Sequence, residues 1–498
     1  MRPVSGQRVH RADATPFPLE KWDDLRAFFV AFRPSGCYFV DCMIASVIKS
    51  HKATLAACFA GYVCQAIVNN FAPLLFVTFQ SEFGIPLSEI TLLVTVNFAV
   101  QLIVDIVSAK LVDRIGYRAA GIVAHVMMGA GFIMMGTLPS ALDDHFAGLL
   151  ASVIVYSVGG GLVEVMLSPL VESCPTRNKS GMMNLLHSFY CWGCVFVIGL
   201  STIVFEFAGI ESWRTLACVW AALPLLNAAL FALIPIPAEK SKETRSRILP
   251  LLGNGMFWVL IVMMFCAGAG ELAVAQWASA FAESGLGVSK AIGDLIGPCL
   301  FAVVMGAVRV ACIPLSKRFS LSALIGVSAG VGIVGYLMVT LVPDPGVALA
   351  GCAVCGASCA LMWPGTFSLA AKNIPSGGTA MFALLAVAGD LGCTTGPTLV
   401  GFVSDNAGGE LKTGILAAVV FPACMLAACI LCRLAEKRKE KLPTLSAAGC
   451  DGLSDRESIV YKGGESAEEG ASRYEESESS SAENTEEEHA IENTKGEM

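Results

Sequence analysis

One carboxylate stands inside an apolar stretch that is long enough to cross a membrane. Glu164 follows Gly159-Gly160-Gly161 within the run 146–171, many residues from either end. A span needs about 20 apolar residues, and a charge near the bilayer centre costs roughly 2.5–3.5 kcal/mol on insertion scales, so it normally faces a cavity or a partner. Pro169 also frees a backbone carbonyl. We predict that Glu164 is a substrate or proton site on a transport helix; a neutral glutamate in a glycine packing patch is the alternative.

Polar side chains interrupt a second apolar stretch. Glu271, Gln276 and Trp277 combine a carboxylate, an amide and an indole, which can together hold a polyol through hydrogen bonds and an apolar ring face. Their spacings of five and six residues do not place all three on one helical face. A joint site and separate structural uses therefore both remain open.

Three further residues each have two interpretations. Asp390 is central in its span and either pairs with Arg309 or lines a cavity. Asp105 lies near the end of its span, where water is close, and a structural use is favoured. A histidine side chain has an ordinary pKa near neutral pH, so His187 is either a proton relay or a hydrogen-bonded interior histidine.

The composition is that of a membrane protein. Of 498 residues, 55% are hydrophobic and 15% charged, and the mean hydropathy is +0.66. Soluble domains carry about 25% charged residues. The net charge of −8 comes largely from an acidic C-terminal tail. Without a basic domain or an aromatic–basic platform, nucleic-acid binding is not expected.

No motif predicts an enzyme. The chain lacks a G-x-x-x-x-G-K-[ST] loop, so ATP-driven transport by this chain alone is not expected. The cysteine pairs lie in apolar spans without a second pair to complete a ligand set, which favours a packing role. These pairs are Cys191/Cys194, Cys352/Cys355 and Cys429/Cys432. We predict no enzyme activity, no cofactor and no metal site.

Twelve apolar spans must position these residues, and we predict an all-α integral membrane protein. The predicted spans are 54–79, 88–110, 118–138, 146–171, 182–205, 213–235, 252–281, 292–315, 320–342, 347–371, 379–403 and 413–434. A charged connection, 236–251, separates two six-helix bundles at 54–235 and 252–434, as in transporters built from repeated halves.

The two ends of the chain differ from the spans. Residues 1–53 form a predicted cytosolic segment without a signal-peptide pattern, and Met43 is a candidate native start. Residues 435–498 become rich in Ser and Glu and predict a disordered acidic tail. Basic residues gather in the even-numbered loops, so the positive-inside rule places these loops and both termini in the cytosol.

The loop after the second span carries a recognisable motif. Its sequence Ala109-Lys110-Leu111-Val112-Asp113-Arg114-Ile115-Gly116-Tyr117-Arg118 resembles the G-x-L-x-D-R-x-G-R-R motif of the major facilitator superfamily. Chemically, Asp113 and Arg114 on a tight turn can pair with the ends of neighbouring helices. With Gly116 and Arg118 they form a predicted conformational latch that rearranges when the bundles rock.

Within that superfamily, the chain is similar to the fucose–proton symporter family of sugar permeases. Asn69 and Asn70 match the family's paired asparagines, and the segment 161–169 matches its G-x-x-E and N-P pattern. The segments 364–374 and 401–405 also match. The resemblance implies that Glu164 binds sugar and exchanges a proton.

The chain departs from this family at three positions. Pro73 stands where the symporter has an aspartate, and His187 and Tyr190 replace its glutamine and asparagine. The first half is therefore expected to present one acid in place of a pair. Asn69, Asn70, His187 and Tyr190 are the expected neighbours of Glu164.

The resulting functional prediction is a secondary transporter of a small polar solute, such as a sugar, driven by protons. We expect a monomer in the plasma membrane, with the bilayer, the solute and protons as partners. The alternatives are a multidrug or metabolite exporter, which would favour an apolar cavity, and a non-transporting membrane sensor with the acidic tail as its output.

Overall fold

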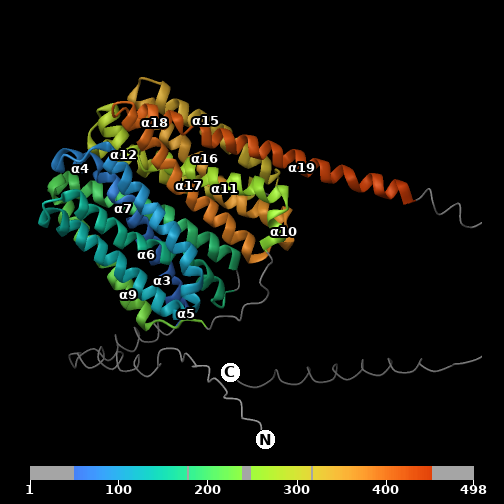
Figure 1. The fold of residues 1–498 in the computed structure, drawn as a ribbon, viewed down its shortest axis with the longest axis horizontal. Coiled ribbons are helices and arrows are strands. Elements are labelled where there is room, and N and C mark those ends of the chain that lie inside the picture. Colours follow the sequence, from blue (N-terminus) through green and yellow to red (C-terminus); the bar gives the residue numbers. More distant parts are fainter. Residues whose placement is uncertain (1–49, 177–178, 238–247, 316–317, 451–498) are drawn as a thin grey trace, which may run out of the picture. The chain divides into compact units, whose positions relative to one another are not determined.

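The computed structural model describes residues 50–176, 179–237, 248–315 and 318–450. These residues form helices and short connections, with no β-strand among them (Figure 1). Within them, 12 helical stretches are long and apolar enough to cross a membrane, which confirms the predicted number of spans. The predicted start at Met43 and the tail beyond residue 450 lie outside the described residues.

The first half of the chain supplies six of the spans. Its elements are α3 (His51–Asn70), η1 (Ala72–Leu75), α4 (Phe76–Phe83), α5 (Leu87–Ala141), α6 (His145–Ser173), α7 (Lys179–Ala208), η2 (Ile210–Ser212), α8 (Trp213–Trp220) and α9 (Ala222–Leu233). α5 carries two spans because the chain turns at Gly116, whose φ of 77° costs glycine little. Asp144 begins α6 by accepting a hydrogen bond from the Ala147 N–H at 3.0 Å.

The second half supplies the other six spans. Its elements are α10 (Ile248–Leu252), α11 (Gly255–Ala275), α12 (Ala278–Ala280), η3 (Phe281–Gly285), α13 (Lys290–Asp294), η4 (Leu295–Cys299), α14 (Leu300–Leu315), α15 (Leu321–Leu341), α16 (Pro345–Asn373), η5 (Pro375–Gly377), α17 (Gly378–Asn406), α18 (Leu411–Ala417) and α19 (Val420–Cys450). α19 continues past residue 434, where the tail was predicted to begin. Glu, Lys and Arg are good helix formers, which explains the extension.

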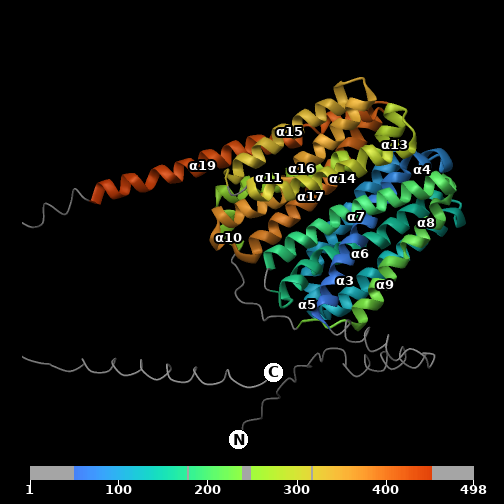
Figure 2. The same ribbon diagram turned by 180° about the vertical axis from the view of Figure 1, so that it is seen from behind.

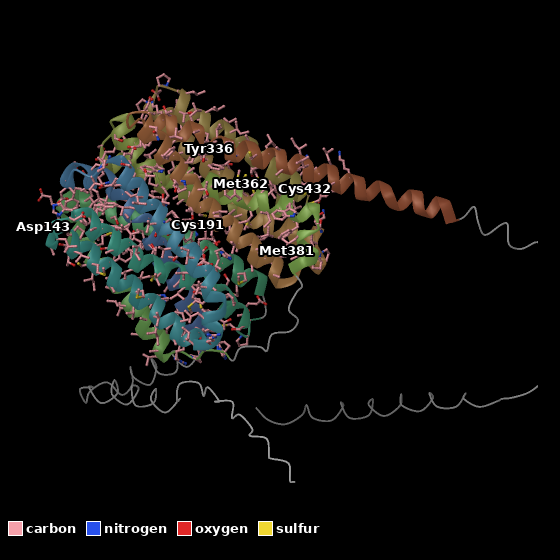
Figure 3. The ribbon with its side chains drawn as sticks, in the orientation of Figure 1. Asp143, Cys191, Tyr336, Met362, Met381 and Cys432 are labelled. Atoms are coloured by element: carbon pink, nitrogen blue, oxygen red, sulfur yellow. The ribbon has the colours of Figure 1, made fainter. Side chains whose placement is uncertain are left out.

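The two halves meet along several elements. α5 contacts α17, α7 contacts α13, η4 and α14, and η1 contacts α12. Figures 1 and 2 show the first half in blue to green and the second half in yellow to orange. Cys191 of α7 is buried at this interface, where its Sγ lies 3.5 Å from an Nη of Arg309 (Figure 3).

A buried polar network also joins the halves, near α4. Lys290 of α13 donates a hydrogen bond to the Leu74 carbonyl of η1 and pairs with Asp294 at 3.2 Å. Asp294 is fully buried and accepts hydrogen bonds from Ser279 and from Thr202 of α7. Because Leu74 and Thr202 belong to the first half, this network ties the halves together at this end.

Candidate functional site: a polar cavity between the two halves

The main cavity lies between the halves and has a volume of about 910 Å³, open space included. Both halves line it. The lining residues are Tyr62, Gln65 and Asn69 of α3; Phe98, Gln101 and Asp105 of α5; Val163 and Glu164 of α6; His187 and Tyr190 of α7; Gly268, Glu271 and Leu272 of α11; Arg309 of α14; Trp363 of α16; and Asp390 and Cys393 of α17.

Two broken helices meet beside this cavity. α3 ends at Asn70, and α11 ends at Ala275. Pro73 has no N–H, so the Asn69 carbonyl lacks its usual helical donor. Gln276 fills that role, because its Nε2 donates to the Asn69 carbonyl at 2.9 Å. Interrupted helices at matching positions of two repeats are typical of transporter binding sites.

A row of amides forms the first-half wall. The Nε2 of Gln65 donates to the Oε1 of Gln101 at 2.7 Å and lies 3.4 Å from the Oε2 of Glu164. The Nε2 of Gln101 donates in turn to the Oδ1 of Asn69 and the Oδ1 of Asn97, each at 3.0 Å. Such groups can donate to and accept from solute hydroxyls.

The sequence prediction missed most of this row. Gln65, Asn97 and Gln101 were not predicted, although a signal was present. Asn97, Gln101 and Asp105 recur every four residues in an apolar span, which places them on one face of a helix.

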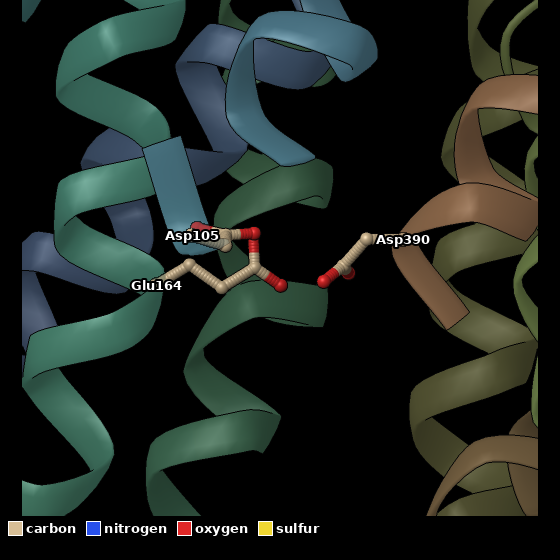
Figure 4. A group of neighbouring side chains, drawn as sticks. All are labelled: Asp105, Glu164 and Asp390. Carbon is tan, nitrogen blue, oxygen red and sulfur yellow. The ribbon is translucent and has the colours of Figure 1, made fainter. Parts of the chain in front are cut away.

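Three carboxylates converge at the cavity. Oxygen atoms of Asp105, Glu164 and Asp390 all lie within 4.8 Å of one another. Figure 4 shows Asp105 and Glu164 together on the first-half side and Asp390 reaching toward them from α17. Asp105 is only 9% exposed, and no N–H or hydroxyl group of the described residues donates to its carboxylate oxygens.

This convergence bears on two expectations. Asp105, for which a structural use was favoured, lines the cavity beside Glu164. The first half therefore presents two acids in place of one. Asp390 lines the cavity and forms no ion pair with Arg309 among the described residues. Arg309 instead donates to the Ala360 carbonyl at 3.2 Å.

The remaining predicted residues divide into two groups. His187, Tyr190 and Glu271 line the cavity with Asn69 and Glu164. The Asn69 Nδ2 lies 3.4 Å from the Tyr190 hydroxyl. The His187 ring packs edge-on against Tyr62, with centroids 5.4 Å apart.

The second group does not reach the cavity. Trp277 is fully buried and donates to the Pro397 carbonyl at 2.9 Å. Gln276 is occupied with the Asn69 backbone, and Asn70 donates to the Ala66 carbonyl and lies 3.2 Å from the Cys194 sulfur. The joint polyol site of Glu271, Gln276 and Trp277 is therefore wrong, because the break after Ala275 turns the amide and the indole toward packing partners.

Trp363 is the aromatic residue that the prediction overlooked. It lines the cavity, and its ring packs so closely on Gly389 that a Cβ there would lie 2.3 Å from the indole. Because Gly389 immediately precedes Asp390 in the sequence, this contact places the indole ring beside the backbone at Asp390. An indole face there offers an apolar surface for sugar carbons.

The predicted latch is described in part. Gly116 makes the turn, and Arg118 donates to the carbonyls of Phe231, Ala232 and Ile234 at the end of α9. Arg118 thus pairs with a neighbouring helix end, inside the first half. Arg114 is exposed, and the Asp113 side chain lies outside the described part of the chain.

Helical spans in two halves around one polar cavity define a membrane transport protein. The family model "Major Facilitator Superfamily" matches residues 57–397, and the chain belongs to this superfamily, whose members are transporters. The "Membrane protein MosC" of Rhizobium meliloti is 24% identical over 317 residues, which cover 61% of this chain and 75% of that protein.

Solved transporters share the fold. The E. coli fucose:proton symporter is 17% identical with a TM-score of 0.56, over 76% of this chain and 98% of that chain. A bacterial homologue of the human lysosomal transporter Spinster, inward-facing and occupied, is 16% identical with a TM-score of 0.63, over 77% and 97%. The D-xylose–proton symporter is 15% identical with a TM-score of 0.63, over 76% and 95%. The predicted major facilitator fold is confirmed.

Proposed function

We propose that this chain is a secondary active transporter that moves a small polar solute, a sugar or related compound, by alternating access and with proton coupling. The observation that carries the proposal is the cavity between the halves, walled by amides and carboxylates where two broken helices meet. The fucose and D-xylose symporters that share the fold are proton-coupled by their names, which supports the same class of solute here.

Glu164 is the proposed proton site. It faces the cavity, and its described hydrogen-bond donor, the Gln65 amide, is distant at 3.4 Å. A proton neutralises the carboxylate, and a neutral side chain is far cheaper inside a membrane than a charged one. Proton and solute therefore meet at one alternating-access site.

The test is uptake by proteoliposomes that contain the purified protein. A panel of sugars and related polyols is offered with and without an imposed pH gradient, and at least one should accumulate only with the gradient. Glu164→Gln should abolish accumulation driven by the gradient. Glu206→Gln, on the same half in α7, is the matched control and should accumulate like the wild type.

Three results would count against the proposal. Uptake that ignores the gradient would leave a uniporter, and wild-type accumulation by Glu164→Gln would refute the role of that residue. Transport of apolar drugs alone would favour an exporter, although the polar wall of Asn69, Gln101 and Glu164 does not suit such cargo. Absence of transport for every class of solute would favour the alternative of a non-transporting membrane sensor.

We further propose a plasma-membrane location with both termini in the cytosol, and a monomer as the working unit. The basic even-numbered loops support this orientation. Epitope tags at residues 1 and 498 should be reached by antibody only after the cell membrane is permeabilised. Labelling of intact cells at either tag would overturn the orientation.

A further inference from the structure

We propose that the solute carries a protonated amine, which the carboxylates of Asp105, Glu164 and Asp390 bind together. The inference rests on the proposed solute site and narrows its occupant from polyols in general to amine-bearing polyols. Two independent features support it. One is the spacing of the three carboxylates, and the other is that one of them is buried without a hydrogen-bond donor.

The spacing suits a primary ammonium group. Such a group has three N–H donors, and charge-assisted N–H···O distances are about 2.7–2.9 Å, so three acceptors in tetrahedral directions lie about 4.4–4.7 Å apart. The oxygens of Asp105, Glu164 and Asp390 lie within 4.8 Å of one another. A solute hydroxyl has one donor hydrogen and no charge, so it can satisfy only one of them.

The burial of Asp105 supplies the second observation. Its two carboxylate oxygens are buried and accept no hydrogen bond from an N–H or hydroxyl group of the described residues, and the side chain points into the cluster (Figure 4). No ion pair among the described residues includes any of the three acids. A buried carboxylate without a donor or counter-charge is strongly unfavourable, so the cluster needs a positively charged or proton-bearing occupant.

The charge of the whole cavity points the same way. Four carboxylates line it, because Glu271 faces the cavity in addition to the three acids of the cluster, against one guanidinium, that of Arg309. Arg309 is engaged with the Ala360 carbonyl and the sulfur of Cys191. The amide row beside Glu164 remains for the hydroxyls of the same solute.

Asp390 gives the ammonium a role in closing the site. Two of the carboxylates that would bind the ammonium group, those of Asp105 and Glu164, belong to the first half. The third, that of Asp390, belongs to α17 in the second half. Without a cation, ionised carboxylates on the two halves repel each other; with one, all three are drawn to the same nitrogen. The amine thus favours the approach of α17 to α5 and α6.

The experiment measures ligand-induced stabilisation of the full-length protein in lipid nanodiscs, at fixed pH and ionic strength and without any gradient. The probes are matched sets: glucosamine, N-acetylglucosamine and glucose; galactosamine and galactose; and 1-amino-1-deoxysorbitol and sorbitol. At least one amine should bind about tenfold or more tightly than its neutral counterparts, as expected for charge-assisted hydrogen bonds.

Two variants test the assigned residues. Asp390→Asn and Asp105→Asn should each weaken amine binding about tenfold or more and leave neutral counterparts unaffected. Asp405→Asn is the control, because Asp405 lies exposed at the C-terminal end of α17. If a variant fails to fold, the comparison of glucosamine with N-acetylglucosamine binding to the wild-type protein still tests the inference.

Binding of neutral members with equal or greater affinity, or of no amine at all, would overturn the inference. These failures are separate from failure of the proposed function. Gradient-driven transport of a neutral sugar would uphold the transporter and refute the ammonium site, whereas an amine that binds but never crosses would do the reverse.

Discussion

At the scale of single residues, the glycines before Glu164 act as packing positions. A Cβ at Gly159 would lie 2.4 Å from the Ala124 carbonyl, and one at Gly161 would lie 2.8 Å from the Val104 Cβ. α6 therefore packs directly against both spans of α5, and this contact holds Glu164 at the cavity wall. The packing interpretation therefore holds for the glycines of this stretch, and the role of Glu164 stays a proposal.

Gly159→Ala should destabilise the protein by about 1–3 kcal/mol, because a Cβ inside backbone contact distance forces the helices apart. The measurement is thermal unfolding in detergent. Gly199→Ala is the control: nothing lies within 4 Å of a Cβ there, and alanine is the better helix former by about 1 kcal/mol. Equal stability of the two variants would contradict close packing at Gly159.

At the scale of elements, the two broken helices depend on each other. Pro73 leaves the Asn69 carbonyl without its helical donor, and the side chain of Gln276, at the end of α11, donates a hydrogen bond to it. In Pro73→Ala a new N–H competes for this carbonyl and straightens α3 into η1. The departure from the symporter pattern at Pro73 thus has a structural effect beyond the loss of an acid.

Pro73→Ala and Gln276→Ala should therefore be non-additive, with a coupling of about 0.5–3 kcal/mol in a double-mutant cycle on unfolding. Both changes act on the same carbonyl, which is the physical reason. Thr137→Ala, whose hydroxyl donates within its own helix to Ile133, should be additive with Gln276→Ala. If the unfolding free-energy changes of Pro73→Ala and Gln276→Ala were additive, Pro73 would not be what leaves the Asn69 carbonyl free to accept from Gln276.

At the scale of the whole molecule, the network of Lys290 and Asp294 holds one end of the two halves together. Leu74 and Thr202 of the first half bind directly to it. Removing one partner of a buried ion pair costs about 3–5 kcal/mol, because the other charge stays uncompensated. The alternating access that we propose requires this end to open, so the network opposes that step.

Lys290→Met should thus favour opening and raise the reaction of Cys299, which is 8% exposed in η4, with a membrane-impermeant maleimide. Peptide mass spectrometry after timed labelling identifies the cysteine. Lys412→Met on α18 should leave the labelling rate unchanged. A wild-type rate in Lys290→Met would show that the network does not control access.

The predicted elements were more accurate than the predicted site. Twelve apolar runs separated by charged loops are a local signal, and the structure confirms their number. Glu164, Asn69, His187 and Tyr190 do line one cavity, but Gln276 and Trp277 do not. The reason is the break after Ala275, which turns these two side chains away; no periodicity in the apolar stretch marks it.

The sequence by itself determined the spans, the membrane class and the cost of a charge at Glu164, because these depend on composition within one segment. Only the tertiary structure decided that Asp105, Glu164 and Asp390 meet, since they come from three helices far apart in the chain. In a membrane, lipid-facing and core-facing surfaces are equally apolar. The pattern of apolar residues therefore does not reveal how each helix is rotated, and helix packing alone brings these carboxylates together.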